Sequence, residues 1–249
     1  MSDKTAAFHA LHVPGDPVIL FNIWDPGSAG AVAAAGAKAL ATGSMPVALA
    51  HGFVDGEMMP RPLAMDNIRR IAAATDLPLT ADLEGGYAVD QEIVEETARL
   101  AIEAGAVGFN FEDQIVGGEG LHEIDVQQTR IRAARSGAPD AYLNARTDIF
   151  LKAKPETHDA AMLEAAIARA HAYRDAGASG FFAPGLVDEA LIAKLVEATD
   201  LPLNILAFPH APPNARLAEL GVARISYGPI PWKRMAAWLE AEARTVLEG

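Results

Sequence analysis

The chain has 249 residues and a formal net charge of −13 at pH 7, which argues against a nucleic-acid partner because phosphate contacts need a basic face. The absence of cysteine excludes disulfides, thiolate metal sites and a cysteine nucleophile. No apolar run is long enough for a membrane span and the first residues do not resemble a signal peptide, so we expect a cytoplasmic protein with no membrane partner.

Eight short apolar runs predict strands, at residues 18–24, 39–44, 77–84, 106–113, 141–148, 178–184, 202–208 and 222–227. Helical patterns lie between them, most clearly at 90–104, 125–136, 157–176, 187–199 and 231–247. Strands that alternate with helices form parallel sheets, and eight such units predict an α/β fold of the (β/α)8 TIM-barrel type. A doubly wound open sheet is the alternative, but its Gly-rich nucleotide turn has only one weak candidate, GSAG at 27–30.

Repeated joints between helix and strand support one βα unit that is used many times. The hexapeptide ATDLPL occurs at 74–79 and again at 198–203, each time between a helical pattern and an apolar run. The segments EAGAVGF at 103–109 and DAGASGF at 175–181 place glycine where a helix C-cap is expected. Because no shift in composition marks a boundary, we expect a single barrel domain over residues 1–249.

Polar side chains gather where the predicted strands end, which is where TIM barrels carry their chemistry. The first five predicted strands end in Trp24-Asp25, Thr42-Gly43-Ser44, Asp82-Leu83-Glu84, Glu112-Asp113 and Arg146-Thr147-Asp148, and the seventh carries Asn204. The starts of the same strands are apolar. This one-sided distribution predicts an active site at the carboxyl end of the barrel.

Asp82, Glu84 and Glu112 form a candidate metal site. Strand alternation points Asp82 and Glu84 to one face, and three carboxylates at one rim need a counter-charge. Their hard oxygen atoms suit Mg2+, or Mn2+, better than zinc. Arg146 adds a planar fork for a carboxylate or phosphate, so metal and arginine together suggest a dianionic substrate that passes through an enolate-like state. The alternatives are structural ion pairs of Asp82 and Glu84 with Arg146, a plain acidic pair that approaches a helix for Glu112-Asp113 and, for Asp25, a helix cap.

These stretches, in this order, resemble the isocitrate lyase / phosphoenolpyruvate mutase superfamily over residues 17–230. The segments that carry the resemblance are FNIWDPGSA, ATGS, GFVDGE, TADLEGGY, FNFEDQ and NARTDIF. The resemblance implies a Mg2+-dependent barrel that acts on small 2-oxo or 2-hydroxy acids through an enolate of pyruvate or a close relative. It also implies a homotetramer, a dimer of dimers, in which the helix at 231–247 is exchanged between neighbouring subunits.

The resemblance further implies a role for each matching site residue. Asp82 would bind the metal directly, while Glu84 and Glu112 would hold metal-bound waters. Asp55 would reach towards the metal and substrate, and Arg146 would clamp the substrate. We therefore take Asp55, Arg146 and Glu112 as catalytic candidates, and as candidates for binding the substrate carboxylate Trp24, Thr42, Gly43, Ser44, Arg146 and Asn204.

One segment departs from the superfamily pattern. The loop QIVGGEGLHEID at 114–125 has neither the cysteine of the lyase catalytic loop nor the Lys and Asn of the phosphonate-active members. Its protic candidates are Glu119, His122 and Glu123, and its glycines suit a lid. After the sixth strand, the lyases place an acidic residue where this chain has Phe182-Ala183-Pro184-Gly185.

Three hypotheses follow. The first is a Mg2+-dependent lyase that cleaves a C–C bond of a small 2-oxo or 2-hydroxy dicarboxylic acid. The second is a mutase or hydrolase for the P–C bond of phosphonopyruvate-like compounds. The third is a non-catalytic barrel that binds a 2-oxo acid without turnover.

Overall fold

The computed structural model describes residues 2–249 and arranges eight parallel strands in the order β1-β8-β7-β6-β5-β4-β3-β2. The strands are β1 (Val18–Leu20), β2 (Leu40–Ala41), β3 (Leu79–Asp82), β4 (Gly108–Glu112), β5 (Tyr142–Arg146), β6 (Gly180–Phe182), β7 (Leu203–Leu206) and β8 (Arg224–Ser226). Past the end of β1, the Ile23 N–H donates to the carbonyl of Ala41, the last residue of β2, at 2.8 Å, and this contact almost closes the barrel. The TIM-barrel prediction is confirmed.

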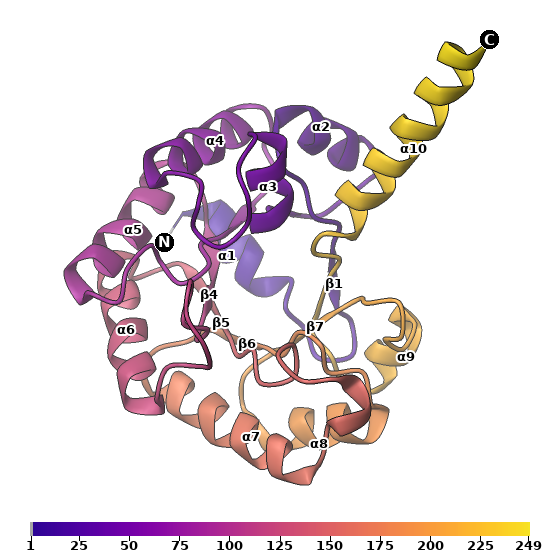
Figure 1. Cartoon of the computed structure of the whole chain (residues 1–249). Helices are drawn as coiled ribbons and strands as arrows, with labels where there is room; N and C mark the ends of the chain where they lie inside the picture. The colour runs from indigo at the N-terminus through magenta and orange to yellow at the C-terminus, as the bar shows by residue number, and fades with distance from the viewer. Residues whose placement is uncertain (1) are drawn as a thin grey trace.

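Most of the helices surround the barrel as a ring in Figure 1, while α1 (Asp3–Ala10) lies across one end of the barrel and α10 (Ile230–Glu248) projects outward. The helices are α1 (Asp3–Ala10), α2 (Pro26–Ala34), α3 (Ser44–Ala50), α4 (Arg61–Ala73), α5 (Gln91–Glu103), α6 (Ile124–Gly137), the 3-10 helix η1 (Pro155–Thr157), α7 (Ala160–Asp175), α8 (Glu189–Ala198), α9 (Asn214–Glu219) and α10 (Ile230–Glu248). The five clearest helical patterns correspond to α5, α6, α7, α8 and α10. The strand expected at 39–44 is shorter than predicted, because helix α3 already begins at Ser44.

Aspartate caps set the starts of several outer helices. The Asp90 carboxylate accepts the N–H groups of Glu92 and Ile93 at the start of α5, and Asp159 and Asp188 cap α7 and α8 in the same way. Asp25 forms a capping box with Ser28 at the start of α2, so its cap function is present. These caps orient the helices that follow the carboxyl ends of the strands.

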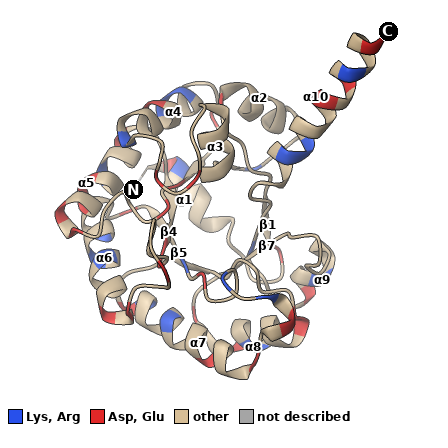
Figure 2. Cartoon of the chain, in the orientation of Figure 1, with Lys and Arg blue, Asp and Glu red and all other residues tan. Residues whose placement is uncertain are grey.

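The main core lies between the sheet and the helices, and a smaller core closes the amino end of the barrel. Phe8 of α1 is fully buried there against Tyr142. Charged residues lie mostly on the outer helices and on α10, which projects away from the barrel (Figure 2). Within residues 2–249, no helix combines the length and apolarity that a membrane crossing requires.

Candidate active site

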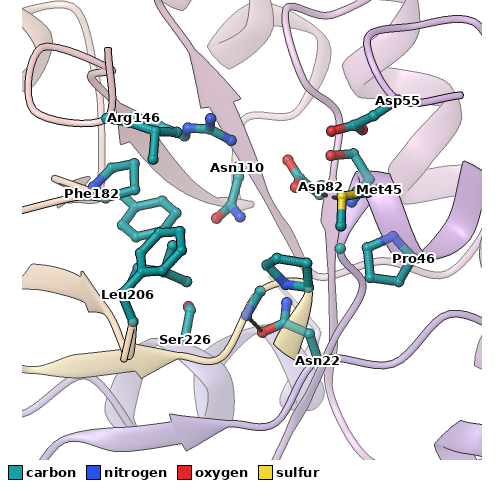
Figure 3. Close-up of a pocket in the computed structure, with 17 residues that line it drawn as sticks. Asn22, Met45, Pro46, Asp55, Asp82, Asn110, Arg146, Phe182, Leu206 and Ser226 are labelled. Carbon is teal, nitrogen blue, oxygen red and sulfur yellow. Dashed lines mark hydrogen bonds between the residues drawn. The ribbon is translucent and has the colours of Figure 1, made fainter. Parts of the chain in front are cut away.

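A cavity of about 150 Å³ opens at the carboxyl ends of the strands. Figure 3 shows Asp82 and Asp55 on one side of it and Arg146 with Phe182 on the other. The residues that line it are Asn22, Gly43, Ser44, Met45, Pro46, Asp55, Asp82, Asn110, Arg146, Leu151, Phe182, Pro184, Leu206, Phe208, Ser226, Gly228 and Pro229. The structure therefore brings together Gly43, Ser44, Asp55, Asp82 and Arg146 from the predicted site.

Asp82 is anchored by the segment that follows β2. Its carboxylate accepts the Ser44 N–H at 3.2 Å, and its own N–H donates to the Thr42 hydroxyl at 2.9 Å. Asp55 lines the same cavity, and burial together with the nearby Asp82 raises its pKa. Two carboxylates thus face one small space, an arrangement that favours a bound cation.

Glu84 does not continue strand β3. The strand ends at Asp82, and Glu84 has a left-handed backbone with φ of +52°. Its carboxylate accepts the Glu57 N–H at 2.9 Å and lines a smaller neighbouring cavity, which it shares with Asp82 and Ser44. Strand alternation therefore does not govern where its side chain lies. Burial, with repulsion from Asp82, raises the pKa of Glu84 to about 8.

Arg146 is held by two carboxylates. Its Nη1 lies 2.8 Å from a Glu112 oxygen, and its Nε and Nη2 donate to the two oxygens of Asp148 at 2.6 and 2.9 Å. A guanidinium has five N–H donors, so one on each Nη stays available to a ligand. Burial raises the pKa of Glu112, and the positive charge of Arg146 opposes that shift.

Three predicted substrate-binding residues lie outside the cavity lining. Trp24 lines a separate hollow beside α2 and α10. The Thr42 hydroxyl accepts the Asp82 N–H, so it supports Asp82 from behind. Asn204 is fully buried, and its amide donates to the Ser226 hydroxyl at 3.2 Å beneath the cavity.

The chain is similar to proteins of one known family over almost its whole length. A family model described as "Phosphoenolpyruvate phosphomutase" matches residues 8–247. The chain belongs to the PEP mutase family. A crystal structure of "a putative phosphonomutase from Burkholderia cenocepacia J2315" is 50% identical, with a TM-score of 0.94, over 98% of this chain and 100% of that one.

Two further relatives of this PEP mutase family member are informative. An uncharacterized protein of Mycobacterium tuberculosis (strain ATCC 25618 / H37Rv) is 34% identical over 98% of this chain and 90% of its own. The structure of 2,3-dimethylmalate lyase, a PEP mutase/isocitrate lyase superfamily member, is 25% identical with a TM-score of 0.85, covering 100% of this chain and 89% of that one. The superfamily resemblance is confirmed, and its named relatives include lyases as well as mutases.

The carboxylates around the cavity fit a divalent cation with Asp82 as its one direct ligand. Among residues 2–249, no three carboxylate or imidazole groups converge as a ready-made metal shell. Asp82 alone of the three predicted ligands lines the main cavity, while Glu84 and Glu112 are held by Glu57 and Arg146. The raised pKa values of Asp55 and Glu84 reflect burial and mutual repulsion, which a hard cation would relieve. The residues therefore suit an ion with one direct carboxylate ligand and other carboxylates further out.

The divergent loop of this family member folds as a small hairpin beside the site. Gln114 and Leu121 form an antiparallel bridge, and the His122 N–H donates to the Asp113 carbonyl at 2.8 Å. Glu119 and Glu123 are exposed, and neither they nor His122 line the main cavity. Burial and nearby arginines lower the pKa of His122. Asp113, next to the site, is fully buried against Arg169 and Tyr173 and is a structural ion-pair partner.

Asn110 is a site residue that the sequence reasoning missed. Its carbonyl oxygen accepts from the Asn144 amide at 2.9 Å and from Nη2 of Arg224 at 3.1 Å. Because Asn144 and Arg224 already donate to that oxygen, we infer that the amide N–H2 of Asn110 is the end that faces the cavity. A usable signal was present: Asn110 lies two residues before Glu112, on the same face of β4.

Proposed function

We propose that the protein is a Mg2+-dependent lyase, also able to use Mn2+, that cleaves a C–C bond of a small 2-oxo or 2-hydroxy dicarboxylic acid. The observation that carries the proposal is the pairing of Asp55 and Asp82 with the partly free fork of Arg146 across one cavity. Asp55 and Asp82 suit a bound metal ion on one side of the cavity, and Arg146 is a cation on the other side. These two positive positions match a substrate with two carboxylates.

Each residue then has a defined task. Asp82 would hold the metal directly, with Glu84 and Glu112 acting through waters; the bound ion would stabilise negative charge that develops as the bond breaks. The two unused N–H donors of Arg146 would bind and orient the second carboxylate. The Asn110 amide would donate to a substrate oxygen from the cavity floor.

A P–C bond mutase or hydrolase is the second candidate. The 50% identity to a structure described as "a putative phosphonomutase" favours it. The charge of the cavity favours the lyase, because a phosphonate carries more negative charge than a carboxylate and Arg146 is the only cationic side chain among the described lining residues.

The first prediction separates these functions. Purified protein with Mg2+ is offered oxaloacetate, 2-methylisocitrate and phosphonopyruvate, while pyruvate and phosphate are measured. We expect pyruvate from a C–C substrate without release of phosphate from phosphonopyruvate. Asp82→Ala should abolish this turnover and weaken Mg2+ binding in calorimetry, because the direct ligand is lost.

The matched control is Asp66→Ala, which removes an exposed carboxylate of α4 that lies outside the cavity. It should keep full activity. Phosphate or phosphoenolpyruvate from phosphonopyruvate would instead support the P–C function. Ligand-dependent thermal stabilisation without any product would support a binding protein. Full activity in Asp82→Ala would contradict the site assignment.

A further inference from the structure

We propose that Arg224 is a positioning residue for substrate binding, which holds Asn110 and Ser226 so that both present hydrogen-bond donors to a negatively charged substrate oxygen. The inference rests on the proposed function, and it deepens the account of how the cavity floor binds a ligand. Asn110 and Ser226 line the cavity, whereas Arg224 is buried beneath them. In Figure 3, Asn110 lies between Arg146 and Asp82, where such a substrate would be held.

Arg224 spans the interior of the barrel below the cavity. It lies on β8, two residues before Ser226, so both side chains are on the same face of the strand. Its Nη2 donates to the carbonyl oxygen of Asn110 on β4 at 3.1 Å. In the strand order β4 is four strands away from β8, which is the opposite side of an eight-stranded barrel. One side chain therefore links two opposite parts of the cavity floor.

The chemistry of arginine decides which end of the Asn110 amide faces the cavity. An amide can rotate and exchange its oxygen and nitrogen, and Asn144 by itself would tolerate either orientation because it has both donors and an acceptor. A guanidinium has donors only, so Arg224 requires the Asn110 oxygen toward itself. Since Asn144 and Arg224 use both lone pairs of that oxygen, the N–H2 of Asn110 is left for the ligand.

Ser226 is held in the same sense. Its oxygen accepts from Nε of Arg224 at 3.3 Å and from the Asn204 amide at 3.2 Å, which uses both lone pairs. The Asn204 carbonyl oxygen lies 3.3 Å away as the alternative acceptor for the hydroxyl hydrogen. Toward a ligand, Ser226 can therefore only donate. Donors that are oriented in advance favour a negative oxygen, because they need not reorganise when it binds.

The surroundings of Arg224 differ from those of a structural arginine. Arg135 on α6 donates from all three of its nitrogens, mostly to main-chain carbonyl groups such as those of Ala141 and Gly177. Arg224 has no carboxylate of residues 2–249 within ion-pair distance, and its Nη1 has no acceptor among those residues. Burial lowers its pKa to about 10, so it stays a cation at neutral pH. Because a buried charge with few partners destabilises a fold, the role of Arg224 lies in the groups that it orients.

The test measures oxalate binding by calorimetry, with and without Mg2+. Oxalate is a dianion that places a carboxylate beside a second negative oxygen, as the enolate of pyruvate does. We expect Mg2+-dependent binding to the unmodified protein. Arg224→Met should weaken this binding at least tenfold, because the donors to a charged oxygen are no longer fixed. Mg2+ without oxalate should bind Arg224→Met at least as tightly as before, since a positive charge that acts on Asp82 is removed.

Thermal unfolding and a conservative variant separate positioning from a structural role. Arg224→Met removes a buried charge, while Asn110 still accepts from Asn144 and Ser226 still accepts from Asn204, so the melting temperature should not fall. Arg224→Lys keeps a cation that can only donate. It should therefore keep the oxalate affinity within about threefold of that of the unmodified protein.

The matched control is Arg135→Met. Arg135 lines none of the cavities described above, and its loss leaves main-chain carbonyl groups without a donor. This variant should melt at a lower temperature and bind oxalate as the unmodified protein does. Should Arg224→Met not fold, Arg224→Gln gives the same comparison. Its amide can accept as well as donate, so it no longer fixes Asn110, and oxalate should bind at least about threefold more weakly.

The outcomes separate the inference from the function on which it rests. If oxalate binds with Mg2+ and Arg224→Met leaves its affinity unchanged, the inference fails and the proposed function stands. The inference also fails if Arg224→Lys loses as much affinity as Arg224→Met, or if affinity falls only together with the melting temperature. If oxalate does not bind in a Mg2+-dependent way, the proposed function fails, and the inference fails with it.

Discussion

His12 is a buried neutral histidine at the amino end of the barrel. Its Nδ1 lies 2.8 Å from the Phe8 carbonyl, and its ring stacks on Tyr142 with centroids 3.8 Å apart. Burial, reinforced by the charge of Arg224, lowers its pKa to about 3. In the unfolded chain this group would titrate at roughly 6.5, so below that pH the unfolded state binds a proton that the folded state does not.

Stability should therefore fall as the pH drops below about 6.5. From this residue alone, we expect a loss of about 1.4 kcal/mol in the free energy of unfolding between pH 7.5 and pH 5.5. Urea unfolding at both pH values measures it. His12→Gln should be less stable at pH 7.5, yet it should show a smaller loss at pH 5.5. An equal loss in both proteins would assign the pH dependence to other groups.

A substitution at Asn110 can separate the role of this residue in substrate binding from its role in stability. Arg224 is buried, and no carboxylate among the described residues lies within ion-pair distance of it. Asn110→Asp keeps the oxygen that accepts from Arg224 and adds a counter-charge, so the melting temperature should stay the same or rise. It also removes the N–H2 that faces the cavity. We expect KM for the C–C substrate to rise at least tenfold.

Thermal unfolding and steady-state kinetics on the same preparation test this combination. Asn110→Ala is the companion variant: it should lose stability as well as affinity, because it leaves donors of Asn144 and Arg224 unpaired. An unchanged KM in Asn110→Asp would remove Asn110 from the binding site.

At the scale of elements, the hairpin that follows β4 is the clearest departure from the superfamily pattern. Its exposed carboxylates, Glu119 and Glu123, lie outside the cavity. We therefore expect the double variant Glu119→Gln/Glu123→Gln to keep kcat within about threefold, since a catalytic acid usually contributes 10²- to 10⁴-fold. A loss of that larger size would show that the hairpin closes over the substrate and supplies the acid.

The strands themselves follow the sequence pattern closely in number and order. What differs is their length, because the polar ends leave the ladder early. β3 stops at Asp82 and β2 at Ala41, and the residues beyond them turn to form the rim. An apolar run in the sequence indicates that its residues are buried. Because buried residues continue past the last hydrogen bond between strands, such runs overestimate the length of the strand.

At the scale of the whole molecule, α10 extends away from the barrel (Figure 1). Trp238 and Leu239 in its middle are 62% and 55% exposed. We propose that this helix packs on a neighbouring subunit in a homotetramer, which would cover these side chains. Light scattering should then give four times the 26.2 kDa chain mass.

Trp238→Glu combined with Leu239→Glu should reduce that mass, because charges replace the apolar contact. Leu63→Glu, at an apolar position on α4 that is 47% exposed, is the control and should leave the assembly intact. A monomeric mass for the unmodified protein would refute the exchange of this helix.

The sequence by itself determined the barrel and the carboxyl-end position of Asp82 and Arg146, and its resemblance to a known superfamily gave the family and the place of Asp55. Periodicity, glycine joints and polar strand ends are local signals in the sequence. In a parallel barrel the carboxyl ends of all the strands lie at one rim, so a residue that ends a strand is placed at that rim. The same logic predicted a role for Trp24 at the rim, yet the structure places this side chain beside α2 and α10.

Only the tertiary structure decided which groups meet. It paired Arg146 with both Glu112 and Asp148, and it gave Glu84 a left-handed backbone conformation. It also oriented the Asn110 amide by a hydrogen bond from Arg224, which is 114 residues away in the chain. It also brought Leu151, Phe182 and Leu206 together around one cavity. Such contacts depend on packing between distant strands, and the pattern of any single segment carries no information about its partner across the barrel.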